Sequence, residues 1–235
     1  MSGASKTNSP LVLYAEGVDP EADLVLVCGQ RKFFVRRAVC ELAFPVLEAM
    51  PDKSSGAEFD VLGHSADTLE KLLLLVDPDG VIALTPKLIR TVAALAHFLG
   101  ADALIQSFYV FLVANHELKN GVAAAAFAVD KLLAEDPKWP HHVLSAMVRE
   151  IIPHNPISDM RDLSHGEAQA YGRMRSREKK VKERMHQLKG LHESTTMALF
   201  HYLATMACEN NVQAMDHAIT TVNGKPTGAY YLGQG

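Results

Sequence analysis

Cysteine is scarce in this sequence, and its cysteines lie far apart. Only three occur among the 235 residues, and no two of them form a C-x-x-C pair. A disulfide scaffold and a cysteine-based zinc module both need recurring, closely spaced cysteines, so the spacing excludes both classes. We therefore expect a chain that works in a reducing, intracellular compartment, either cytoplasmic or nuclear. The three cysteines are Cys28, Cys40 and Cys208.

Long apolar runs are also missing. Residues 1–10 are polar and lack the apolar centre of a signal peptide. The most apolar stretch, residues 93–114, is interrupted by polar residues such as His97 and Asp102, whereas a membrane-spanning helix needs about 20 consecutive apolar residues. The sequence therefore predicts no membrane contact. A composition of 48% hydrophobic and 21% charged residues predicts a globular chain with one large domain or two small ones.

The short motifs that carry common catalytic chemistry are absent. The sequence has no G-x-S-x-G elbow, no G-x-x-x-x-G-K-[ST] loop, no H-E-x-x-H and no G-x-G-x-x-G. It has eleven histidines, but neighbours such as His186 and His192 are not three or four residues apart, as zinc ligands on one helical face are. We therefore expect no catalytic residue, no cofactor and no metal, and we predict that the protein is not an enzyme.

The net charge of −4 conceals one strongly basic segment. Residues 173–189 contain eight basic and two acidic residues, whereas the first 115 residues contain 9 basic and 14 acidic ones. In a helix, four of these cations would align at spacings of 4, 3 and 4 and could contact nucleic acid or an acidic protein surface. The same cations could instead cover the solvated side of a helix that packs its apolar residues inward, so both interpretations stay open. The aligned residues are Arg173, Arg177, Lys180 and Arg184.

Residues 10–115 mix strand and helix patterns, which predicts an α+β domain with a small mixed sheet flanked by helices. A β-branched apolar run at 23–28, closed by Gly29 and followed by a second run at 32–35, predicts a hairpin. Ser65 and Thr85 are expected to cap the helices that follow them. The other expected elements are two short helices within 36–50 separated by Pro45, strands at 58–62 and 81–84, and helices to about Val76, from Pro86 to Gly100 and over 101–115.

Residues 116–222 show only helical patterns, so an all-helical extension is expected after the α+β domain. Prolines should interrupt it, because proline removes a backbone donor and clashes with the preceding turn. The terminal residues 1–9 and 223–235 are expected to be flexible. The predicted segments of the extension are a helix at 118–134, a helix from Asp136–Pro137 to Pro153, a break at 153–163, a capping box at Ser164–Glu167, and a long helix, or two joined near Gly190.

Four segments, in this order, resemble a BTB/POZ domain. The resemblance covers about residues 10–115 and implies the BTB fold, dimerisation and protein–protein interaction, with a helical extension of the kind that follows many such domains. The segments are Asp23-Leu-Val-Leu-Val-Cys-Gly-Gln-Arg-Lys-Phe-Phe-Val-Arg-Arg-Ala-Val39, Phe44-Pro-Val-Leu-Glu-Ala-Met50, Leu69–Val76 and Leu88–Leu104.

The resemblance also implies which residues would meet a second copy. Asp23 and Arg37 match the family's acidic and basic positions at the dimer-facing pocket, and Arg36 stands where the family usually has histidine. The N-terminal apolar segment and the first helix are expected to bury apolar area against the partner copy. The implied interface residues are Leu11, Val12, Leu13, Asp23, Arg36 and Arg37.

These observations favour an oligomeric adaptor or scaffold that forms a homodimer or larger homo-oligomer. One alternative is a structural subunit of a large assembly, such as a particle coat, whose basic helix contacts nucleic acid or acidic neighbours. A second alternative is a substrate adaptor of a cullin-type ubiquitin ligase. Residues 81–90 contain no acidic residue, whereas members that recruit cullins often carry a hydrophobic-x-Glu motif in this region, so cullin is the weaker candidate partner.

Overall fold

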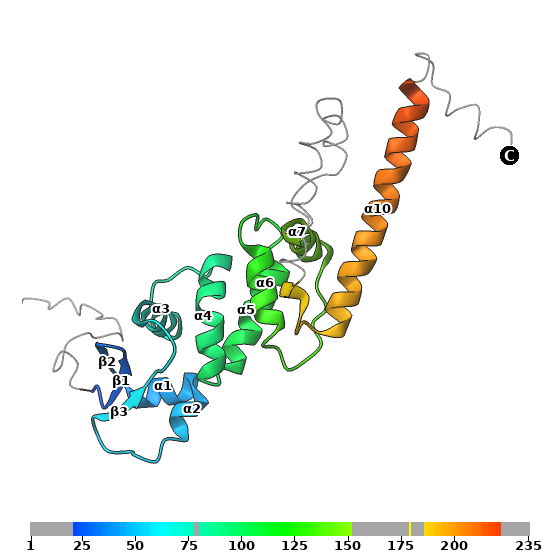
Figure 1. The fold of residues 1–235 in the computed structure, drawn as a ribbon. Coiled ribbons are helices and arrows are strands. Elements are labelled where there is room, and N and C mark those ends of the chain that lie inside the picture. The colour runs from blue at the N-terminus through cyan, green and yellow to red at the C-terminus, as the bar shows by residue number, and fades with distance from the viewer. Residues whose placement is uncertain (1–20, 78–79, 152–178, 180–185, 222–235) are drawn as a thin grey trace, which may run out of the picture. The chain divides into compact units, whose positions relative to one another are not determined.

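The fold is mixed α+β, as expected, and divides into two compact units. The computed structural model describes residues 21–77, 80–151, 179 and 186–221, with the side chains of the last helix described at residues 193–206, 208 and 209 (Figure 1). The first unit spans residues 1–135 and the second 136–235. Within the described residues, the elements of the first unit are β1 (Leu24–Cys28), β2 (Arg31–Val35), α1 (Arg37–Ala43), α2 (Pro45–Glu48), β3 (Ala57–Asp60), α3 (Ala66–Val76), α4 (Pro86–Phe98), α5 (Asp102–Ala114) and α6 (Val122–Asp130). Those of the second unit are α7 (His141–Ile151), the 3-10 turn η2 (His186–Leu188) and α10 (Glu193–Thr221).

The sheet is built around the predicted hairpin, which is confirmed. β1 is the central strand in the order β2-β1-β3, antiparallel to β2 and parallel to β3. Gly29 adopts a φ of +61° in the tight turn, a conformation that glycine tolerates best. Leu24, Leu26 and Phe33 are fully buried, so the sheet contributes a complete apolar layer to the core. The third strand occupies Ala57–Asp60, one to two residues earlier than expected.

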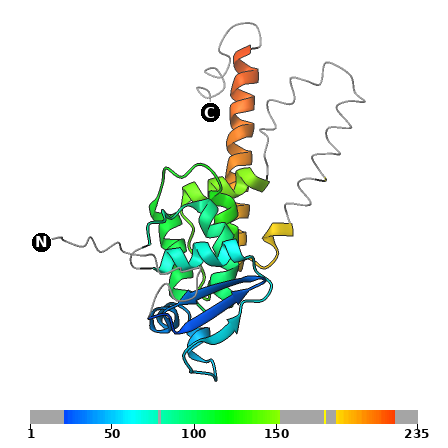
Figure 2. The same cartoon turned by 90° about the vertical axis from the view of Figure 1, so that its left-hand side faces the viewer.

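Local signals correctly placed most helices of the first unit. Two short helices, α1 and α2, meet at Phe44, immediately before Pro45. The hydroxyl oxygens of Ser65 and Thr85 each accept a hydrogen bond from the backbone N–H three residues on, at 3.2 Å, and so cap α3 and α4 as expected. Figure 1 shows α3 between the sheet and α4, and Figure 2 shows the helices α4, α5 and α6 at the opposite end of the unit from the sheet.

The strand expected at residues 81–84 is wrong. This stretch is irregular, although it alternates as a strand would: Val81 and Ala83 are exposed, whereas Ile82 and Leu84 are half-buried. Such alternation indicates an extended segment with one side covered by the protein, but it does not show that the segment is hydrogen-bonded to a neighbouring strand. In the described sheet, whose strand order is β2-β1-β3, residues 81–84 pair with neither of the outer strands. Residues 81–84 therefore remain a connection into α4.

Helix α6 is shorter than the expected helix at 118–134, and it belongs to the first unit. It begins after Gly121, whose φ of +76° lies outside helical geometry and prevents the helix from starting earlier. It contacts α4 and α5. The division between the two compact units falls between Glu135 and Asp136.

Gly100 ends α4 in the left-handed conformation, at the position where the sequence predicted the end of this helix. Its φ is +73°, and the N–H groups of Gly100 and Ala101 donate to the carbonyls of His97 and Ala96 at 3.0 and 2.8 Å. This pairing satisfies the last carbonyls of the helix in the manner of a Schellman motif. A Cβ atom at this position would lie 3.3 Å from Val46 Cγ2. The end of α4 thus packs directly against the start of α2.

Gly100→Ala is expected to destabilise the first unit by more than Gly63→Ala. Both glycines have a positive φ, which costs an alanine about 1–2 kcal/mol. At Gly63 nothing lies within 4 Å of the added carbon, whereas at Gly100 the side chain of Val46 must also move. Urea unfolding of the two variants, followed by circular dichroism, measures the difference. Equal losses of stability would show that α2 does not pack on this turn.

The second unit is helical in its described residues. The helix expected from Asp136–Pro137 begins later, at His141, because Pro140 cannot donate within a helix; its carbonyl instead accepts from Val143 and Leu144 at 3.0 and 3.1 Å. Gly190, with a φ of +81°, separates η2 from α10, which agrees with the predicted junction. No helix in the described residues has the length and apolarity to cross a membrane.

Candidate protein interface

Two groups of predicted interface residues lie outside the described residues. The first is the N-terminal segment Leu11, Val12 and Leu13, and the second is the aligned set Arg173, Arg177, Lys180 and Arg184. Of the basic segment between 173 and 185, only Lys179 is described, and it is exposed. The predictions for both groups stay predictions. The other three predicted residues, Asp23, Arg36 and Arg37, lie together at the start of α1.

Asp23 connects three parts of the first unit. Its Oδ1 accepts a hydrogen bond from the backbone N–H of Arg37 at 2.7 Å and so caps α1 from outside the helix. Its backbone N–H donates to the carbonyl of Val35 at 3.2 Å, and its carbonyl accepts from Gly56 at 2.8 Å. β1, β2, α1 and the chain entering β3 are therefore fastened to one another around this residue.

The guanidinium of Arg37 is buried and bonded within the unit. The residue is 8% exposed, and its donors reach the carbonyl oxygens of Ser54 and Asp52 at 3.2 and 3.5 Å and Glu41 Oε1 at 3.4 Å. A buried charge is tolerated only when it is paired and hydrogen-bonded, and these three acceptors meet that condition. Within one chain, Arg37 thus anchors the loop at residues 52–54 to α1.

Lys53 extends this polar cluster to the solvent. Its Nζ donates to Glu41 Oε1 and to the carbonyl of Glu48, both at 2.7 Å. The hydrogen bond from Lys53 is the main reason that the pKa of Glu41 lies below its ordinary value, and the charges of Lys53 and Arg37 act in the same direction. Glu41 therefore stays ionised at neutral pH and bridges Lys53 and Arg37.

Arg36 differs from its neighbour Arg37. It is exposed, and its guanidinium forms an ion pair with the exposed carboxylate of Glu21 at 2.8 Å. Exposed pairs of this kind contribute little to stability, because solvent screens them and two long side chains must be ordered. Of Asp23, Arg36 and Arg37, Arg36 is the only one that is exposed.

Helices α1 and α2 each have one buried side. Cys40, Phe44 and Leu47 are all fully buried and follow one another at spacings of 4 and 3. Burial, with the nearby charges of Asp23 and Glu41, raises the pKa of the Cys40 thiol to about 12. The thiol is therefore protonated at neutral pH and behaves as a small apolar core group.

The opposite side of α1 and α2 is apolar and exposed. Leu42 is 88% exposed, and Val46 is 37% exposed. We call this surface the α1–α2 face. An apolar side chain of this size left in water is a potential contact, because its burial against a partner would be favourable by about 1.5–3 kcal/mol. The exposed residues that make up the face are Ala38, Leu42, Pro45, Val46 and Ala49.

The sequence analysis named the first helix as an interface element but missed Leu42. The signal that could have found it is the spacing of four between Ala38 and Leu42, which puts both residues on the side of the first helix away from Cys40.

Comparison with known proteins gives no match: neither the scan against protein-family models nor the search of curated proteins finds one for this chain. Among the described residues, no group of three or more histidine, cysteine, aspartate or glutamate side chains is arranged to hold a metal ion. The α1–α2 face and the charged cluster of Arg37, Glu41 and Lys53 are the candidate site.

Proposed function

We propose that this protein is a non-enzymatic interaction module that self-associates through the α1–α2 face and serves as an oligomeric scaffold or adaptor. The observation that carries the proposal is the 88% exposure of Leu42 on α1, on the side of this helix away from the fully buried Cys40. An isologous dimer uses the same surface of both copies, so one face of this kind is sufficient to form it.

The order of elements supports the proposal. The resemblance to a BTB/POZ domain implied a hairpin, two short helices, a strand, a helix and a later helix pair, and the first unit has these elements in this order without the strand at 81–84. The resemblance also placed the first helix in the dimer contact. Because Asp23 and Arg37 fix the start of α1, the α1–α2 face is held on a rigid support, which lowers the entropic cost of binding.

Leu42→Glu is the variant that tests self-association. In a twofold interface the substitution occurs twice, so it removes two apolar contacts and places two carboxylates close together. We expect the molar mass measured by light scattering after size exclusion to fall by one association step. The circular dichroism spectrum should not change, because Leu42 is exposed in the single chain.

Val81→Glu is the matched control. Val81 is a fully exposed apolar residue of the same unit that lies outside the α1–α2 face, so the same new charge should leave the mass unchanged. A wild-type chain that is monomeric at high micromolar concentration would rule the proposal out. So would an equal loss of mass in both variants, because it would show a general effect of added charge.

A further inference from the structure

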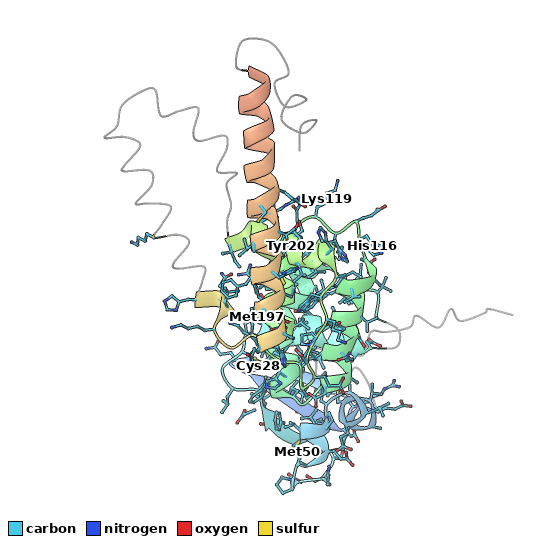
Figure 3. All side chains as sticks on the ribbon, turned by 90° about the vertical axis from the view of Figure 1, so that its right-hand side faces the viewer. Cys28, Met50, His116, Lys119, Met197 and Tyr202 are labelled. Atoms are coloured by element: carbon cyan, nitrogen blue, oxygen red, sulfur yellow. The ribbon has the colours of Figure 1, made fainter. Side chains whose placement is uncertain are left out.

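The α10 helix carries a row of exposed, mostly apolar residues on the side opposite to its packed side. On the packed side, Thr195 and Leu199 are buried, and the ring of Tyr202 contacts the ring of His141 in α7, with centroids 4.8 Å apart. On the other side Met197 is 62% exposed. Figure 3 labels Met197 and Tyr202 on this helix. At 100° per residue, Met197 lies about 160° around the helix from Leu199, so the two apolar sides are distinct.

The exposed stripe continues along the helix with a regular spacing. Its described members are all exposed and follow one another at intervals of 4, 3 and 4: Met197, His201, Ala204 and Cys208. The sequence then repeats these intervals on the helical backbone at Val212, Met215 and Ile219. Two repeats of eleven residues match the 3.6-residue turn closely, so the positions stay on one side of the helix from 197 to 219. We call these seven positions the α10 stripe.

We propose that the α10 stripe is a second homotypic interface, in which α10 of one copy pairs antiparallel with α10 of another. The intervals 4, 3, 4, 4, 3, 4 read identically in both directions, so an antiparallel partner brings every stripe position opposite another stripe position. Cys208 then lies at the twofold axis, and the small Ala204 lies opposite the larger Val212. This is the self-complementarity that an isologous interface requires.

The charges of α10 also favour a second copy of this helix as the partner, in antiparallel orientation. The helix contains three acidic residues, Glu193, Glu209 and Asp216, and no lysine or arginine. An anionic lipid surface or a nucleic acid would be repelled by such a helix. In a parallel pair each carboxylate would lie near the same carboxylate of the other chain, and the two negative charges would repel each other. In the antiparallel pair Glu209 lies opposite Ala207, and Asp216 lies opposite Phe200.

The length of α10 sets the expected strength of the contact. A helix of 29 residues is roughly 44 Å long. In the antiparallel register centred on Cys208, only residues 195–221 of the two copies overlap, which is roughly 40 Å of helix. A contact strip of this length and about 10 Å width on each copy buries on the order of 800 Å² in total, below the ~1,000 Å² at which stable specific interfaces begin and in the range of weak contacts. We expect association at micromolar concentrations. Combined with the α1–α2 face, a step that rests on the proposed function, two homotypic interfaces on one chain would link copies into assemblies larger than a dimer.

Chemical crosslinking through Cys208 tests the pairing. Cys208 is exposed, whereas Cys28 and Cys40 are buried, so a short bifunctional maleimide should join two full-length chains at Cys208 only. We expect a covalent dimer that the Cys208→Ser variant lacks. Leu42→Glu should retain this dimer, and Met197→Glu combined with Ala204→Glu, at two exposed positions, should lose it without unfolding the chain.

The orientation has its own readout. On a Cys208→Ser background, Met197→Cys mixed with Ile219→Cys should crosslink, and Met197→Cys alone should not. Crosslinking of Met197→Cys alone would indicate a parallel pair and overturn the antiparallel arrangement.

The outcomes separate this inference from the proposed function. A Leu42→Glu chain that gives no Cys208 crosslink overturns the α10 pairing, whatever its mass. A wild-type chain that crosslinks at Cys208 but has the same mass as Leu42→Glu overturns the α1–α2 face and leaves the α10 pairing intact. A monomer in which Cys208 reacts slowly with a monofunctional maleimide would show that the stripe is covered within one chain, which also overturns the pairing.

Discussion

Phe44→Ala is expected to lower the free energy of unfolding of the first unit by about 3–5 kcal/mol, the usual cost of deleting a large buried aromatic side chain. Phe44 is fully buried at the junction of α1 and α2. Its N–H donates to Cys40 at 2.7 Å and its carbonyl accepts from Leu47 at 2.9 Å, so the backbone holds the side chain in place and collapse of the cavity is limited. Urea unfolding monitored by circular dichroism measures the loss.

Leu42→Ala is the control within the same helix. The substitution removes most of the leucine side chain, but this side chain is 88% exposed in the single chain. We therefore expect the free energy of unfolding to change by no more than about 0.5 kcal/mol. Both variants are best compared at a concentration low enough for the chains to be monomeric, because association adds to apparent stability. If Phe44→Ala and Leu42→Ala cost the same, the assignment of the buried and exposed sides of α1 is incorrect.

Elements whose signals are local could be predicted from the sequence. The hairpin was predicted because a β-branched run, a glycine turn and a second apolar run follow one another within 13 residues, from Asp23 to Val35. The helices α3 and α4 were predicted because Ser65 and Thr85 are caps that act three residues away. The left-handed turn at Gly100 belongs to the same class.

Elements that depend on distant partners could not be predicted in this way. The alternation at residues 81–84 predicted a strand, but an extended segment becomes a strand only where the fold brings it beside a sheet edge, and residues 81–84 pair with neither β2 nor β3, the outer strands of the described sheet. The start of α7 was placed too early for a different, local reason: a helix that began at Pro137 would include Pro140, which cannot donate a backbone hydrogen bond within a helix.

The candidate site shows the same division. The sequence identified Asp23 and Arg37 only through a family resemblance, and nothing near Arg37 in the chain indicates that the carbonyls of Asp52 and Ser54 will enclose its guanidinium. The exposure of Leu42 could not be predicted from the sequence either. Both sides of the first helix pair carry apolar residues at helical spacing, and only the packed positions of Cys40 and Phe44 decide which side remains in water.

Arg37→Gln is expected to destabilise the first unit by about 2–3 kcal/mol, because it removes a charged donor from buried acceptors. The glutamine side chain is shorter than that of arginine, and its amide cannot reach both Glu41 and the carbonyl of Ser54. At least one of these acceptors therefore loses its hydrogen-bond donor. Arg37→Lys should fall between wild type and glutamine, since a single ammonium keeps the charge without the two-pronged geometry of the guanidinium. Hydrogen exchange of the α1 amides and of residues 52–56 should increase together.

Arg36→Gln is the matched control, one residue away. Arg36 is exposed and pairs with the exposed Glu21, so its loss should cost no more than about 1 kcal/mol. The pair of variants also separates two roles for Arg37. If Arg37 anchors the loop within one chain, Arg37→Gln lowers the stability of a chain already made unable to associate by Leu42→Glu. If Arg37 instead acts at the contact between copies, as the family resemblance implied, the same substitution leaves that chain's stability unchanged and weakens only the association of chains that retain Leu42.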